Sequence, residues 1–97
     1  MTIEKVQNGA TLTVTLDGRL DTITSPDLEQ SLSDLTGVTH LVLDFAKISY
    51  VSSAGLRVLL ALQKQMSKQG DLVVRNVDHM VMEVLEMSGF VDILTIE

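Results

Sequence analysis

Residues 41–60 read LVLDFAKISYVSSAGLRVLL, and this stretch decides the fold. Residues 40–46 are mostly apolar, interrupted by Asp44, which is typical of a strand that is buried on both faces. Two serines follow, and apolar residues then recur at helical spacing to about Gln69, where Gly70 ends the pattern. A buried strand that leads into an amphipathic helix indicates an α/β protein with a parallel sheet.

The residues before this stretch predict a hairpin. Residues 10–17 alternate strictly between apolar side chains and threonine, as in a half-buried strand. Asn8-Gly9 is a hairpin turn signal that joins this strand to a weaker one over residues 2–7. Gly18 breaks the alternation, so we expect the second strand to end there.

A first helix is predicted to open at Ser25, which can act as its N-cap, with Pro26 at the first helical position. Gly37 closes this element. The apolar positions at helical spacing are Leu28, Leu32 and Leu35.

The C-terminal part repeats the strand–helix order. Residues 72–77 predict a strand, and Asp78 caps a further helix. Gly89 can adopt the left-handed conformation after this helix, with Phe90 folding back as a hydrophobic contact. Residues 93–96 form a last short strand, so we expect a single α/β domain over residues 1–97. Its order is β-β-α-β-α-β-α-β, with a mixed, mostly parallel sheet that is covered by helices.

The composition excludes several classes of function. The formal charge of −6 and the aromatic content of 3% disfavour nucleic acid as a partner, because phosphates are repelled and bases find few rings to stack on. The absence of cysteine removes disulfides and thiolate metal sites. No apolar run is long enough to span a membrane, and MTIEKVQNG lacks the apolar segment of a signal peptide. We therefore expect a cytoplasmic protein without membrane insertion.

Signatures of enzymes are absent from the sequence. It contains no Gly-rich phosphate loop and no G-x-S-x-G elbow. His40 and His79 stand at the starts of a strand and a helix, without a partner at metal-ligand spacing. A serine hydrolase would need one of them as its base, but both are expected far from the serine pair. We expect no catalytic residue, no metal and no cofactor bound by this chain.

The remaining candidate site is the start of the second helix. Ser52 is expected to cap this helix, and Ser53 is then its first residue, with its hydroxyl near the positive end of the helix dipole. A phosphate on Ser53 would add about −1.5 to −2 charge at an exposed helix end. Gly55 allows another surface to approach the first turn closely.

The same helix separates an apolar side from a polar side. The apolar side, which we expect to be buried, consists of Leu56, Val58, Leu59, Leu62 and Met66. The opposite side carries Ser53, Arg57, Ala61, Lys64 and Lys68. This basic side is either a solvated face or a docking face beside the serine, and the spacing does not distinguish the two.

Three motifs resemble the STAS domain, the family of bacterial anti-sigma factor antagonists: GRLD at 18–21, the stretch 41–60, and VLEMSGFVDIL at 84–94. The resemblance covers nearly the whole chain and implies a STAS-like fold. In that family, a partner that is both anti-sigma factor and serine kinase phosphorylates the residue just before the glycine of a D-S-[ST]-G-L segment. The unphosphorylated antagonist binds this kinase and frees the sigma factor, and a PP2C-type phosphatase restores the binding form. ATP and magnesium belong to the kinase.

This chain departs from the family pattern at one decisive position. Alignment on Gly55 places Ser52 at the Asp of the pattern, Ser53 at its Ser and Ala54 at the acceptor. The resemblance therefore implies either that Ser53 is the acceptor, with Ser52 as second choice, or that the protein works without a phosphoswitch. It also implies a role for the acidic residue at the end of GRLD. The expected partner-binding residues are Asp21, Ser52, Ser53, Ala54, Gly55, Arg57, Ala61 and Lys64.

Two functions follow from this resemblance. The leading hypothesis is an anti-sigma factor antagonist that acts by protein–protein binding and is regulated by serine phosphorylation. The alternative is a non-phosphorylated STAS subunit of another complex, such as a lipid-transport ABC ATPase, which Ala54 favours because such a subunit needs no acceptor. An enzyme is a distant third possibility, since the sequence offers no convergent polar groups beyond the serine pair.

Overall fold

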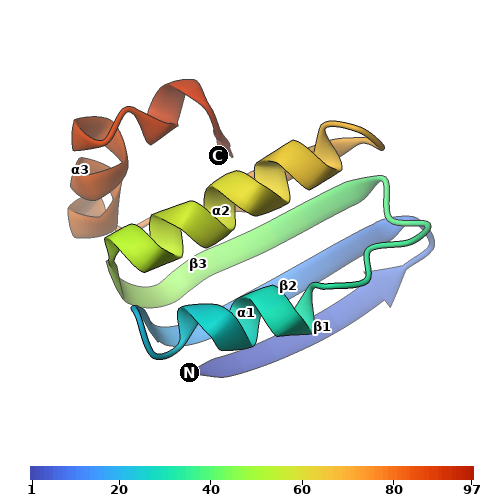
Figure 1. Ribbon diagram of the computed structural model, residues 1–97, viewed down its shortest axis with the longest axis horizontal. Helices are drawn as coiled ribbons and strands as arrows, with labels where there is room; N and C mark the ends of the chain where they lie inside the picture. The colour runs from blue at the N-terminus through green and yellow to red at the C-terminus, as the bar shows by residue number, and fades with distance from the viewer.

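The computed structural model describes residues 1–97 and contains one five-stranded sheet, in the order β1-β2-β3-β4-β5 (Figure 1). The β1 strand is antiparallel to β2, and the other pairings are parallel. This confirms the predicted fold class and the predicted order of strands and α-helices. The elements are β1 (Thr2–Asn8), β2 (Thr11–Leu20), α1 (Ser25–Ser31), β3 (His40–Val51), α2 (Ser53–Met66), β4 (Asp71–Arg75), α3 (His79–Met87), the 3₁₀ helix η1 (Phe90–Asp92) and β5 (Thr95–Ile96).

Strand β2 keeps the predicted alternation, because Leu12, Val14 and Leu16 are buried while the threonines between them are half-buried. The expectation that Gly18 ends the strand is wrong. Gly18 adopts a φ of 127°, which side chains resist, and the strand continues to Leu20 with register shifts against β3 on either side of Gly18. The glycine thus absorbs an irregularity inside the strand instead of ending it.

Strand β3 is also longer than the predicted strand over residues 40–46. It runs to Val51, which pairs with Leu20 of β2, and only Ser52 separates it from α2. Burial after Phe45 no longer alternates, since Ile48 and Val51 are buried while the residues between them are exposed. The pairing with β2, and not an apolar pattern of its own, therefore keeps this segment in the sheet.

Helix α1 begins differently from the prediction. The N-cap is Thr24, whose side chain makes no capping hydrogen bond, and Ser25 is the first helical residue. Ser25 is only 2% exposed, and its hydroxyl has no hydrogen-bond partner. Because the Ser25 N–H donates to the carbonyl oxygen of Asp21 at 2.9 Å, the preceding turn and not Ser25 starts the helix. The helix ends at Ser31, so Leu32 and Leu35 are buried outside it.

The C-terminal elements follow the predictions closely. Asp78 caps α3, with its carboxylate accepting from the N–H groups of Met80 and Val81 at 2.7 and 3.2 Å. Gly89 has the expected left-handed conformation, with a φ of 79°, and Phe90 packs against the core. The last strand is shorter than predicted because the N–H groups of Ile93 and Leu94 still donate to the carbonyl oxygen of Phe90 in η1. Helix α2 ends at Met66, and the chain then turns up to Gly70.

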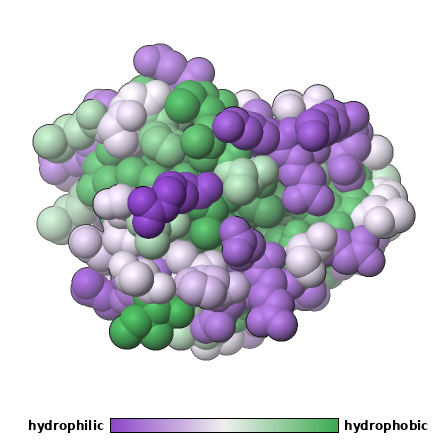
Figure 2. Space-filling model, viewed as in Figure 1, coloured by the Kyte–Doolittle hydropathy of each residue, from purple (hydrophilic) through white to green (hydrophobic).

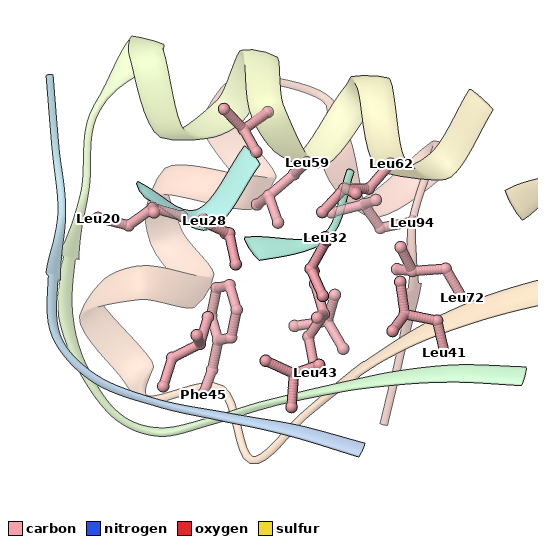
Figure 3. Close-up of a cluster of buried hydrophobic side chains, with 14 of the residues drawn as sticks. Leu20, Leu28, Leu32, Leu41, Leu43, Phe45, Leu59, Leu62, Leu72 and Leu94 are labelled. Carbon is pink, nitrogen blue, oxygen red and sulfur yellow. The ribbon is translucent and has the colours of Figure 1, made fainter. Parts of the chain in front are cut away.

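One continuous core of 22 buried residues lies between the helices and one face of the sheet (Figure 3). Helices α1 and α2 lie side by side over this face, and α3 lies beside the end of β3 (Figure 1). The apolar side of α2 is buried as predicted, with Leu56 half-buried at its margin. No helix is both long enough and apolar enough to cross a membrane.

Gly55 marks a close approach between α2 and β2. A Cβ atom at this position would lie 2.8 Å from Cγ of Leu20 and 2.9 Å from the carbonyl oxygen of Leu20. Gly55 is itself buried. The expectation that this glycine admits another surface is therefore wrong, because the chain's own strand occupies the space.

We predict that Gly55→Ala destabilises the protein by about 1–2 kcal/mol. Overpacking against Leu20 costs about 2–3 kcal/mol, the upper part of the usual range, because one of the clashing atoms is a backbone carbonyl oxygen, and the better helix propensity of alanine returns about 1 kcal/mol of this. Urea unfolding measures the change. The matched control is Ser53→Ala in the same turn, which is exposed and should shift stability by less than about 0.5 kcal/mol. Equal stabilities of the two variants would contradict the close contact.

Candidate functional site

The candidate site lies where the parallel strands β2 and β3 end side by side. The N–H of Ser52 donates to the carbonyl oxygen of Leu20 at 2.9 Å, which ties the start of α2 to the end of β2. Both α1 and α2 begin at this same edge of the sheet (Figure 1). The carboxyl edge of parallel strands is where open α/β sheets bind their ligands.

The serine pair has the two roles that the sequence predicts for its local structure. Ser52 is the N-cap, and its Oγ accepts from the N–H of Gly55 at 3.3 Å. Ser53 is the first residue of α2 and is exposed to solvent. Since the hydroxyl of Ser52 is engaged in the cap, Ser53 offers the more accessible hydroxyl at the positive end of the helix dipole.

A tight turn over residues 21–24 forms the other wall of the site, and we call it the Asp21 turn. The carboxylate of Asp21 accepts from the N–H groups of Ile23 and Thr24, each at 3.0 Å. The Thr24 hydroxyl donates to the carbonyl oxygen of Arg19 at 2.6 Å and accepts from the N–H of Asp21 at 3.0 Å. These bonds hold the turn rigid while the side chain of Ile23 remains 83% exposed.

The hydrogen bonds of this turn also fix the charge of Asp21. The hydrogen bond from the Thr24 N–H lowers the pKa of Asp21 below its usual value of 3.8. Desolvation opposes this shift, and the hydrogen bond from the Ile23 N–H adds to it. Arg19, whose Nε lies 3.8 Å from the carboxylate, lowers the pKa further. Asp21 therefore stays ionised and shapes the backbone at the site.

A cleft of about 400 Å³ separates the first turns of α1 and α2. Ala54 lines this cleft, whereas Ser53 does not, in keeping with the angle of about 100° between adjacent helical residues. Arg57 also lines the cleft and forms no ion pair there. The remaining lining residues are Thr22, Ser25, Pro26, Glu29 and Val58.

The polar side of α2 extends away from this cleft. Arg57, Ala61, Lys64 and Lys68 are all exposed, as predicted. No acidic residue lies in the first turn of α2, and Lys64 lies in its last turn. Together with Ser53, these side chains form an exposed surface with a positive charge, which suits contact with an acidic surface.

Both histidines are paired with carboxylates and not with the serines. His40 forms an ion pair with Asp71 at the starts of β3 and β4, and His79 lies 3.2 Å from Glu83 within α3. Neither imidazole is hydrogen-bonded to Ser52 or Ser53. No group of three or more potential metal ligands is gathered anywhere in the chain.

Sequence reasoning missed part of this site. It did not identify Thr24 and Ile23, although D-x-x-T is a recognisable turn pattern in which Asp accepts from following N–H groups. It also did not foresee the cleft, because the cleft depends on how α1 packs against α2. The expected residues Asp21, Ser52, Ala54 and Arg57 nevertheless lie at one edge of the sheet, with Ala61 and Lys64 further along α2.

Comparison with known proteins places this fold in a family. The family model of the STAS domain matches residues 2–97. BtrV of Bordetella bronchiseptica, a proposed anti-sigma factor antagonist, is 35% identical over 99% of this chain and 84% of its own length. The chain belongs to the STAS domain family.

Solved structures show the same fold at low sequence identity. A proposed anti-sigma factor antagonist from Thermotoga maritima superposes with a TM-score of 0.90 at 15% identity, covering 97% of this chain and 84% of that one. The anti-sigma factor antagonist SpoIIAA in its unphosphorylated form gives a TM-score of 0.76 at 16% identity, covering 99% of this chain and 87% of that one. At such identities the likeness establishes the fold alone.

We predict that Asp21 contributes to stability in a pH-dependent way. Because its pKa is lower in the folded chain, its contribution is fully present above the unfolded pKa and is lost as the pH falls through the folded pKa. Asp21→Asn should therefore be less stable than wild type at about pH 7 and should lose less stability between about pH 7 and pH 3. Urea unfolding at both pH values measures this, with the exposed Asp17→Asn as the control. An acid-induced loss equal to that of wild type would rule out this role.

Proposed function

We propose that this protein is an anti-sigma factor antagonist, which binds an anti-sigma factor and thereby frees a sigma factor. The observation that carries the proposal is the likeness to BtrV, at 35% identity along nearly the whole chain. The chain spans most of the length of BtrV, so the shared segment includes both the Asp21 turn and the start of α2.

The proposed docking surface consists of residues at the exposed edge of the site. Ser53, Arg57, Ala61 and Lys64 follow one another along the solvent side of α2. The other proposed residues position this surface. Ser52 caps the helix, and Gly55 packs against Leu20. Asp21 holds its turn, and Ala54 lines the cleft. The positive charge of the surface favours an acidic patch on the partner.

We also propose Ser53 as the phosphate acceptor, with Ser52 as second choice. Ser53 is exposed, and its position at the helix start favours a negative charge. Arg57 stands four residues later on the same face, where its guanidinium can pair with a phosphate. The partner kinase supplies ATP and magnesium, and a PP2C-type phosphatase removes the phosphate. SpoIIAA, which shares the fold, has been solved in a phosphorylated form.

Ala54 supports a second candidate function. A STAS subunit of another machine, such as a lipid-transport ABC ATPase, requires no acceptor at the position of Ala54. This candidate uses the same fold and the same exposed side of α2. It differs from the first in its partner and in the absence of a kinase, and both differences can be measured.

We predict that Ser53→Asp weakens binding to the anti-sigma factor kinase of the same organism by about tenfold or more, which corresponds to about 1.4 kcal/mol. The added charge alters the docking surface and must be desolvated on binding. Isothermal titration calorimetry measures the affinity. Ser53→Ala should bind like wild type, and Ser33→Asp, an exposed serine after α1, is the control for added charge. Wild-type affinity of Ser53→Asp would exclude Ser53 from the interface.

Incubation with the kinase, ATP and magnesium should place phosphate on the peptide that contains Ser53. Peptide mass spectrometry identifies the site, and Ser53→Ala should abolish the modification. Phosphate on neither Ser53 nor Ser52 would remove the switch but leave the binding function in place. A stable complex with an ABC ATPase, together with no binding to the kinase, would favour the second candidate function instead.

A further inference from the structure

Helix α3 carries more apolar surface than the core covers. Val81 and Leu85 are buried in the core, whereas Met80 is 70% exposed and Met87 is 90% exposed. Met80, Val84 and Met87 are spaced by four and then three residues, so they form one stripe along the helix beside the buried side. We call these three residues the methionine stripe.

A groove of about 260 Å³ runs between the methionine stripe and the end of β3. Six of its eight lining residues are hydrophobic, which sets it apart from the polar cleft between α1 and α2. Figure 2 shows hydrophobic side chains interspersed with hydrophilic ones over α3. The lining residues are Ser49, Tyr50, Val51, Met80, Val81, Glu83, Val84 and Met87.

This end of the molecule concentrates the exposed apolar surface of the chain. Of the seven large hydrophobic residues that are exposed, five belong to the end of β3, α3 or the segment after it, and only Val6 and Ile23 stand elsewhere. Single exposed apolar residues are ordinary, but a contiguous group marks an interaction site, and three of these residues, Tyr50, Met80 and Met87, line the groove together. The five are Tyr50, Met80, Met87, Val91 and Ile93.

The charge on the α3 side of the groove is one-sided. Residues 76–97 contain five carboxylates and neither lysine nor arginine, so they carry −5 of the formal charge of −6. Glu83 lines the groove beside the methionine stripe. Two cations lie near the β3 wall of the groove: Lys47 is two residues before Ser49, and Arg19 stacks on the ring of Tyr50 at 4.4 Å while it pairs with Asp21. The acidic charge is therefore confined to the α3 side of the groove.

We propose that this groove binds an amphipathic helix of a partner protein, one whose apolar seam faces the methionine stripe and whose flanks carry lysine or arginine. The four–three spacing of the stripe is the spacing with which helices pack along one another, and Glu83 stands where such pairs place their flanking charges. Methionine side chains adapt to the shape of an incoming apolar residue. The acidic surroundings select a cationic partner.

The same observations disfavour two other occupants. A second copy of this chain would bring two acidic C-terminal segments together, and their repulsion opposes such a dimer. An anionic lipid surface would be repelled by the five carboxylates in the same way. The groove is lined by none of the residues of the proposed phosphorylation site, so the inference holds whether or not Ser53 accepts a phosphate.

The test is a methyl NMR titration of the full chain, labelled at its five methionines, with a synthetic helical peptide of two heptads. The peptide has leucine at its seam positions and lysine at the others. The methyl signals of Met80 and Met87 should shift on binding, while that of Met66, which is fully buried under α2, should not. A peptide with glutamate in place of each lysine should bind at least about tenfold more weakly.

Two variants complete the experiment. The double variant Met80→Gln/Met87→Gln should weaken binding of the lysine peptide by about tenfold or more, while Val6→Gln, a change at an exposed apolar residue of β1, should leave it unchanged. Wild-type affinity of the double variant, or equal binding of the two peptides, would overturn the proposal. A dimer of the wild-type chain in sedimentation, or its binding to phosphatidylserine vesicles, would also overturn it if the double variant abolished that association.

Discussion

The contact between Leu20 and Gly55 fixes the geometry on which the rest of the site depends. Leu20 is fully buried, its carbonyl oxygen receives the N–H of Ser52, and its side chain lies where any side chain at position 55 would have to go. This contact sets both the height and the rotation of the first turn of α2 over the sheet. Because the turn is fixed, Ser52 is used as the cap, Ser53 faces solvent and Ala54 lines the cleft.

The features that could be predicted from the sequence are those that depend on neighbouring residues. The caps at Ser52 and Asp78 form hydrogen bonds within a few residues, and the alternation in β2 reflects a single strand with one buried face. The STAS motifs also lead to the family to which the chain belongs. At the candidate site, the exposure of Ser53 and of the basic side of α2 follows from helical periodicity alone.

Two of the features that were missed depend on residues far apart in the chain. The extension of β3 to Val51 requires pairing with Leu20, and the role of Gly55 is set by the same distant strand. Ser25 has the composition of an N-cap, but the turn held by Asp21 and Thr24 begins the helix one residue earlier and leaves the Ser25 hydroxyl without a partner. In the first two cases a contact with a distant strand overrode the local preference. In the third, the neighbouring D-x-x-T turn competed with the cap at Ser25, so the missed signal was itself local.

The distribution of charge explains why one small acidic chain can offer surfaces to partners of different character. The exposed side of α2 is basic, whereas the C-terminal segment after Arg75 holds carboxylates without a single lysine or arginine. Charges on separate faces act within about 10 Å at ordinary ionic strength, so each face presents its own sign to an approaching protein. Electrostatic complementarity affects the rate and the specificity of association more than its strength, so the two faces suit partners of opposite charge.

Positions 53 and 54 in the first turn of α2 have different surroundings. A side chain at position 54 lines the cleft between α1 and α2, and the carboxylate of Glu29 lines that cleft as well. The guanidinium of Arg57 lines the same cleft, so a phosphate at position 54 would meet charges of both signs. At Ser53 it would stand on the open side of the helix, with Arg57 one turn further along and no acidic residue in the first turn. Ser53 thus differs from position 54 in lying outside the cleft that Glu29 lines.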